Sequence, residues 1–115
     1  NLSNNLTSPS FKIQIESNKL LLDKIKLEIY SELKQTYNQY ISSIAINNIE
    51  RRNSKTAANF FNRAKSQYNQ GMISNNDFRM AQVELKESQN RLNQSIYLTK
   101  LAELNLYRIS GSILK

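Results

Sequence analysis

The stretch from residue 64 to residue 85, AKSQYNQGMISNNDFRMAQVEL, decides the fold because it stops one helix and starts another. Gly71 is the residue type that most often follows a helix C-terminus, since it adopts the left-handed conformation without steric cost. Ser74 and Asp77 then have the spacing of a capping box, and an apolar-periodic run follows at once. Only a few residues separate the two helices, which predicts an antiparallel helical hairpin.

A helical pattern runs upstream of this turn from residue 11 to residue 69. No Gly or Pro lies between Ser10 and Gln70, and the apolar residues recur at helical spacing. The pattern becomes polar between Asn47 and Ser54, so it leaves open whether the helix is continuous there. A continuous helix would be about 85 Å long at about 1.5 Å per residue. The apolar positions are Ile15, Leu22, Ile25, Ile29, Leu33, Tyr37, Tyr40, Ile44, Ala57, Phe61, Ala64 and Tyr68.

The chain after the turn carries a more regular pattern, a heptad seam that persists through residues 78–110. Half of the seam residues are small, and small residues let two helices approach closely while burying little apolar area per turn. A hairpin of this kind is weak alone, so we expect neighbouring helices in the intact protein. Gly111 follows the seam and is predicted to end the second helix. The seam consists of Phe78, Ala81, Leu85, Ser88, Leu92, Ser95, Thr99, Ala102, Leu106 and Ile109.

Together these patterns predict an all-α fold, a long antiparallel and coiled-coil-like helical hairpin. Residues 1–10 are predicted to be a polar loop in which Ser8 or Ser10 caps the first helix. We expect the first helix over residues 11–69, the hairpin tip over 70–77, the return helix over 78–110 and the C-terminal end over 111–115. Folding about Ile73 sets large residues opposite large ones and small residues opposite small ones. The expected pairs are Tyr68 with Phe78, Ala64 with Ala81, Phe61 with Leu85 and Ala57 with Ser88.

The composition argues against an enzyme. Cys and His are absent, which removes disulfides, thiol nucleophiles, imidazole bases and the usual soft metal ligands. The remaining carboxylates, amines and hydroxyls form no evident catalytic set, so we expect neither catalysis nor a cofactor. The formal net charge of +7 permits contact with nucleic acid or an anionic membrane. The basic residues are scattered, however, and their one dense cluster, Arg51, Arg52 and Lys55, is better explained as a solvated helix face.

From the way the chain begins, we expect a piece cut from a longer protein. The chain begins abruptly in polar residues, and no signal peptide precedes the helical pattern. No segment approaches the roughly 20 apolar residues that a membrane-spanning helix needs. We therefore expect no membrane-spanning helix in this stretch.

The stretch from Ala64 to Gly111 resembles part of the repeat found in TolC-like outer-membrane efflux proteins. It contains the motif A-x3-Y-x2-G-x2-S-x2-D-F-x2-A-Q-x2-L and, later, L-x-L-Y-x3-G. Upstream, residues 27–58 fit the long helix of the same repeat by pattern, so the resemblance covers residues 12–113. The matching residues are Ala64, Tyr68, Gly71, Ser74, Asp77, Phe78, Ala81, Gln82, Leu85, Leu104, Leu106, Tyr107 and Gly111.

The resemblance implies a conduit segment for efflux or type I secretion. TolC-like proteins are homotrimers in the outer membrane of diderm bacteria, and their helices form a tunnel across the periplasm. Each protomer carries two such repeats, whereas this chain holds one. The hairpin tip would dock a periplasmic adaptor (membrane fusion) protein and, through it, an inner-membrane pump in a tripartite assembly. The tip residues implied are Gln70, Gly71, Met72, Ile73 and Ser74.

The resemblance also implies an aperture at the tip, which Tyr68 and Asp77 would help to hold closed. Two positions depart from the pattern of the family. Gln70 stands where an apolar residue commonly precedes the Gly, and Ile73 stands where a basic residue sometimes follows it. A gating ion pair that depends on that basic residue is therefore not expected here.

Two other classes of function remain compatible with the sequence. The first is a coiled-coil interaction module, such as the hairpin of an adaptor protein or a secreted helical antigen. The second is a basic helical arm that binds nucleic acid, which predicts duplex binding that weakens steeply with salt. We expect the conduit segment, with no nucleic-acid partner, because the scattered tyrosines and lysines fit helix packing and solvation better.

Overall fold

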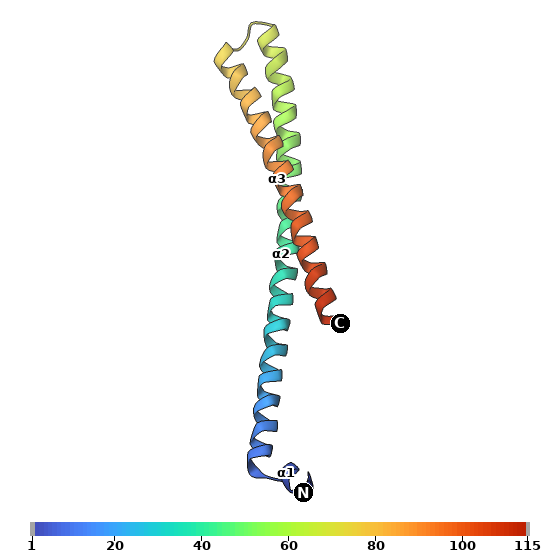
Figure 1. Cartoon of the computed structure of the whole chain (residues 1–115). Coiled ribbons are helices and arrows are strands. Elements are labelled where there is room, and N and C mark those ends of the chain that lie inside the picture. Colours follow the sequence, from blue (N-terminus) through green and yellow to red (C-terminus); the bar gives the residue numbers. More distant parts are fainter. Residues whose placement is uncertain (1, 115) are drawn as a thin grey trace.

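The computed structural model describes residues 2–114, with the side chains of residues 3–5 and 7–111, and forms a helical rod (Figure 1). Its elements are α1 (Leu2–Leu6), α2 (Pro9–Asn69) and α3 (Asn75–Leu114), and no strand occurs within the described residues. The two long helices run antiparallel along a body of 99 × 21 × 14 Å. The predicted all-α hairpin is confirmed.

The short helix α1 and the start of α2 differ from the polar loop expected over residues 1–10. Residues 2–6 form a helical turn, and α2 begins at Pro9 rather than at Phe11. Proline is suited to the first helical position but excludes the helical conformation from the residue before it. Ser8 is accordingly extended (φ −64°, ψ 145°), and its side chain accepts a hydrogen bond from the Phe11 amide at 3.3 Å. Of the two candidate caps, Ser8 is the one used.

The turn after α2 is a Schellman motif built around Gly71. The Gly71 amide donates to the Tyr68 carbonyl oxygen at 3.0 Å, and the Met72 amide donates to the Gln67 carbonyl oxygen at 2.8 Å. Gly71 has a φ of +73° and is the only described residue with positive φ. A left-handed residue at this position satisfies the last carbonyl groups of the helix and reverses the chain.

Ser74 caps α3 as the sequence predicts, but the helix begins at Asn75 rather than at the expected residue 78, so the tip is shorter than the expected 70–77. The Asp77 amide donates to Ser74 Oγ at 3.1 Å, which is one of the two hydrogen bonds of a capping box. At its other end α3 does not stop at Gly111, so that expectation was wrong: the helix continues to Leu114. A glycine inside a helix costs roughly 1 kcal/mol relative to alanine but does not break it when the backbone keeps a helical φ.

The predicted seam of α3 is the surface that packs on α2. All of its residues are buried or half-buried, and its small members are the most deeply buried, with Ser88 at 0% and Ala81 at 1% exposure. Opposite them, α2 buries Ala57 and Ala64. The expected register is met at the tip, where the Tyr68 and Phe78 rings stack with centroids 4.6 Å apart. The core is therefore one row of close helix contacts.

The helix α2 is continuous through Asn47–Ser54, because its polar residues there have partners on α3. Asn47 Nδ2 donates to Ser95 Oγ at 3.0 Å. Glu50 is half-buried, with Oε2 3.4 Å from Arg91 Nε. In this part of α2, polar contacts with α3 replace the apolar contacts made elsewhere along the seam. The helix is therefore packed and uninterrupted there.

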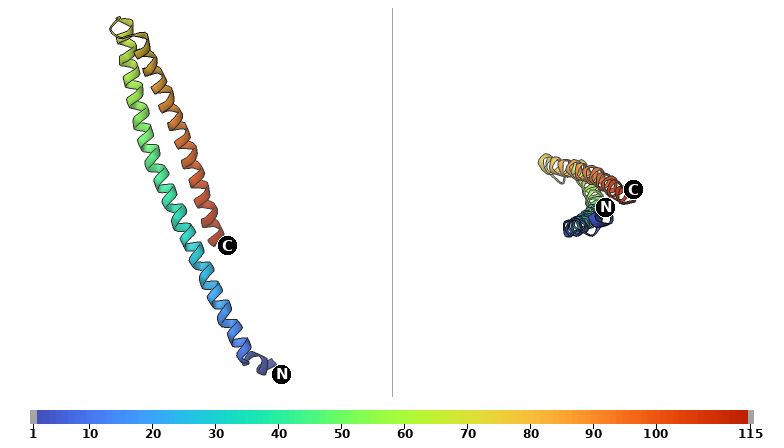
Figure 2. Two further views of the ribbon diagram at one scale, coloured as in Figure 1. Left: turned by 90° about the vertical axis from the view of Figure 1, so that its left-hand side faces the viewer. Right: turned by 60° about the horizontal axis from the view of Figure 1, so that its bottom comes forward.

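The N-terminal third of α2 extends beyond α3, and among the described residues only the short α1 contacts it, at its start (Figures 1 and 2). Its apolar side chains are exposed, since nothing of the described hairpin reaches them: Ile13 (66%), Leu20 (71%), Leu21 (56%), Leu22 (52%), Ile25 (43%) and Leu27 (68%). This extension agrees with a hairpin that is completed by other helices.

The length of the rod can be measured in solution. Small-angle X-ray scattering with molar mass on the monomeric chain should give a radius of gyration near the 27.9 Å of the structure. A value near the ~13–14 Å of a globular domain of this size would contradict the continuous α2.

Close packing at Ser88 predicts that extra volume destabilises the hairpin. Ser88→Leu should lower the free energy of unfolding by about 1–3 kcal/mol, because a fully buried position offers no room for a branched side chain. Val83→Leu, at a 48% exposed position of the same helix, is the control and should stay within about 0.5 kcal/mol. Urea unfolding followed by circular dichroism measures both, and equal effects would refute the close seam.

Candidate functional site

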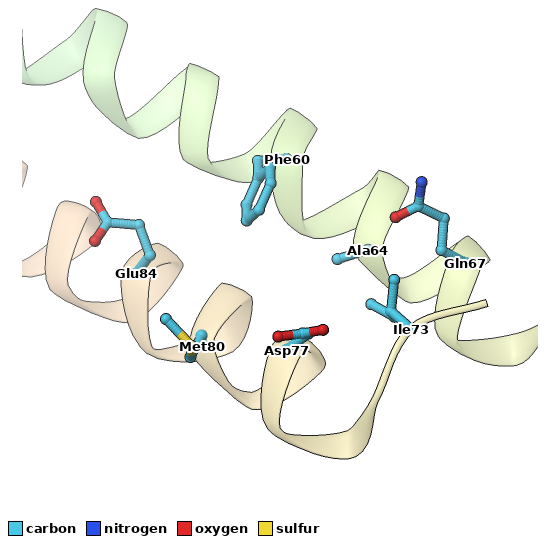
Figure 3. Close-up of a pocket in the computed structure, with 7 residues that line it drawn as sticks. All are labelled: Phe60, Ala64, Gln67, Ile73, Asp77, Met80 and Glu84. Atoms are coloured by element: carbon cyan, nitrogen blue, oxygen red, sulfur yellow. The ribbon is translucent and has the colours of Figure 1, made fainter. Parts of the chain in front are cut away.

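The five predicted tip residues lie together in the turn between the last residue of α2, Asn69, and the first of α3, Asn75. Met72 is 67% exposed at the end of the rod. Ile73 is half-buried instead, and Figure 3 shows its side chain pointing back toward Ala64 of α2. The tip therefore offers one apolar side chain to solvent, where the sequence suggested two.

The surface around Gly71 is open. A Cβ atom built at Gly71 would meet nothing within 4 Å, so packing within the hairpin does not require the glycine. Its positive φ does require it, because an L side chain in this conformation costs roughly 1–2 kcal/mol. The open backbone is accessible to close contact from outside.

An aromatic stack holds the two helices together directly behind the tip. The ring of Phe78 stacks on Tyr68 with an interplanar angle of 7°, and its centroid lies 5.8 Å from that of Phe61. Such pairs contribute about 0.5–1.5 kcal/mol beyond the area they bury. Tyr68 is 38% exposed, and its hydroxyl forms no hydrogen bond with another described residue. Its ring packs, while its polar end remains available.

Asp77 takes part in the N-terminal cap of α3 and in a groove between the helices. Its backbone amide is used by Ser74, and its carboxylate lines a groove between α2 and α3 (Figure 3). Tyr68 and Asp77, the two predicted aperture residues, form no hydrogen bond with each other. Within one hairpin they are therefore two separate features, one in the aromatic stack and one in the groove.

The groove beside Asp77 contains residues that the sequence analysis missed. It has a volume of about 470 Å³. Phe60 of α2 and Met80 of α3 line it, and they are 49% and 69% exposed. Each precedes a seam residue, Phe61 or Ala81, so each lies on the flank of its helix rather than in the seam. The sequence could have indicated this groove, because large apolar residues occupy the position before a seam residue on both helices. The groove is lined by Phe60, Ala64, Gln67, Ile73, Asp77, Met80 and Glu84.

Charge is distributed unequally between the two flanks of the hairpin. The residues that precede the seam positions form what we call the Asp77 face, where Asp77, Glu84 and Glu87 accompany basic residues. The residues that follow the seam positions form the basic face, where the one acid, Glu103, pairs with Lys100 at 3.4 Å. Most of the excess charge of the hairpin thus lies on one side. The basic face carries Arg51, Lys55, Lys65, Arg79, Lys86 and Lys100, all exposed.

The cluster Arg51, Arg52 and Lys55 is solvent-exposed along α2, as a solvated face requires. Arg51 donates to Asn47 Oδ1 at 3.2 Å within the same helix. Among the described residues there is no group of acidic side chains close enough together to hold a metal ion. The candidate functional features are therefore surfaces for binding: the open turn, the aromatic stack, the groove and the basic face.

A rod of two antiparallel helices, with its apolar residues on open flanks and an accessible turn at one end, defines a hairpin segment of a larger helical assembly. The model of the outer membrane efflux protein family matches residues 10–112, and the chain belongs to this family. Members are channel and transport proteins of the outer membrane with periplasmic helical domains, and they form trimers that work with adaptor and pump partners. The resemblance to TolC-like proteins is confirmed.

No curated protein and no solved structure matches the chain with significance. Within the described residues, neither long helix has an apolar stretch long enough to cross a bilayer.

Stability of Tyr68 variants separates packing from a role of the hydroxyl. Tyr68→Phe should leave the free energy of unfolding within about 0.5 kcal/mol, because the stack is kept. Tyr68→Ala should lower it by on the order of 1–2 kcal/mol, since the stacked pair and its apolar area are lost. Thermal unfolding of the chain measures both. A large loss for Tyr68→Phe would mean that the hydroxyl is itself part of the packing.

Proposed function

We propose that this hairpin is a wall segment of a periplasmic conduit, with its tip docking an adaptor protein that connects the channel to an inner-membrane pump. In the intact protein the segment belongs to a homotrimer, and its cargo passes by efflux or type I secretion. The family match supports the conduit role. The geometry of the tip is the observation that supports docking.

Three features of the tip suit it to docking. The turn lies at the extreme end of a 99 Å rod, so a partner can approach it without contacting the helix flanks. Met72 presents an exposed apolar side chain, which favours burial against a partner. The open backbone at Gly71 permits close approach of another main chain. Gln70 and Ser74 flank these groups and supply polar contacts at the rim of the docking surface.

Tyr68 and Asp77 are proposed to control the aperture that neighbouring tips form. Tyr68 is anchored by its ring against Phe78, while its hydroxyl has no hydrogen-bond partner among the described residues. The Asp77 carboxylate forms no ion pair with a described residue. Tyr68 is thus held by a ring of the opposite helix, and both side chains are available to a residue of an adjacent hairpin.

The exposed apolar extension of α2 supports a multi-helix wall. Its leucines and isoleucines lie on more than one side of the helix, as in a helix with neighbours on both flanks. A lone coiled-coil module would not need such a surface beyond the reach of its return helix.

The docking proposal can be tested in the intact protein with Met72→Glu. This change keeps the backbone of the turn and adds a charge to the exposed apolar side chain, so export and adaptor cross-linking should fall about tenfold or more, as expected for a central contact worth at least ~1.4 kcal/mol.

Val83→Glu adds the same charge at a 48% exposed apolar residue away from the turn and is the control. Trimer assembly, followed by native gel electrophoresis, should be unchanged in both variants. Normal export by Met72→Glu would refute docking at the tip.

A further inference from the structure

We propose that the groove beside Asp77 binds amphipathic organic cations, molecules with an apolar or aromatic body and an ammonium group. The reading of this ligand as cargo rests on the proposed function, whereas the binding itself does not. The argument uses the shape of the groove, the chemistry of its floor and the charge of its rim.

The groove has the size and surface of a small-molecule site. Its volume of about 470 Å³ lies within the roughly 300–1,000 Å³ of typical ligand pockets. Figure 3 shows Phe60 and Ala64 on the α2 side, Met80 on the α3 side and Ile73 closing the end nearest the turn. Because Met80 is 69% exposed, an apolar ligand would remove from water a side chain that the hairpin leaves uncovered.

The rim of the groove carries two carboxylates, of which Glu84 is ion-paired and Asp77 is not. The Asp77 carboxylate lines the groove and has no ion-pair partner among the described residues. Glu84 lies at the opposite end, with Oε1 3.2 Å from Arg91 Nη2. Arg63 and Arg91 line one neighbouring hollow and Arg79 lines another, whereas no basic residue lines this groove. A bound cation would therefore meet Asp77 first, without a competing arginine in the groove.

Phe60 adds a second reason for a cationic ligand. Its ring is half-exposed and faces the groove. An ammonium group over an aromatic face is attracted by the ring quadrupole, and a phenyl group of the ligand can stack there instead. Asp77 and Phe60 come from different helices, so the site exists only when the hairpin has closed in the observed register.

A matched pair of soluble probes tests the proposal on the chain as described. Phenylpropylammonium and phenylpropanol have the same apolar body and differ in charge. In titrations followed by amide NMR, both should shift residues 60–67 and 73–84, and the cation should bind about two- to fivefold more tightly, as expected for one exposed ion pair. Raising the salt to about 1 M should remove this advantage, because the Debye length falls to about 3 Å.

Three variants complete the test. Asp77→Asn should abolish the preference for the cation, and Phe60→Ala should weaken both probes. Glu28→Gln removes one exposed carboxylate from the extension of α2, far from the groove, and should leave binding unchanged. Equal affinity for the two probes, or an unchanged preference in Asp77→Asn, would overturn the proposal and leave an apolar surface for a partner helix. Export by the intact protein is a separate measurement, so loss of the conduit role would not alter these results.

Discussion

The close approach of α2 and α3 along a row of alanines and serines is the constraint on which the rest of the hairpin depends. Ser88 and Ala81 are fully covered by the opposite helix, so no larger side chain fits between the helix axes at these points. This contact fixes the register, and the register places Phe78 against Tyr68 and Ser95 against Asn47. Other large apolar residues, such as Phe60 and Met80, lie on the flanks, where they remain exposed.

A narrow seam explains why the molecule is suited to an assembly. Small residues bury little apolar area per turn, so a hairpin of this length gains only modest stability from its own interface. The flanks and the extension of α2 carry apolar surface that further helices can bury, which agrees with membership of a family of trimeric channels. Charge is also divided between the two flanks. One is the basic face, and the other, the Asp77 face, carries carboxylates and the groove.

The tip combines local backbone geometry with long-range packing. The Schellman turn at Gly71 and the cap at Ser74 need only neighbouring residues. The aromatic stack and the groove need both helices, because Phe61 and Phe60 come from α2 while Phe78 and Met80 come from α3. The proposed docking and ligand sites are thus positioned by the same seam that closes the hairpin.

The sequence by itself determined the two long helices, the turn at Gly71 and the identity of the α3 seam, because capping and heptad spacing are local properties of the chain. Spacing could not tell a left-handed glycine from a helical one, so Gly111 was wrongly expected to end α3, and residues 2–6 were wrongly expected to be a loop. Only the tertiary structure decided that α2 continues through Asn47–Ser54, that Ile73 turns inward and that Phe60 and Asp77 share a groove. Each of these depends on which residue of the opposite helix lies nearby. The spacing of residues along one helix does not determine that.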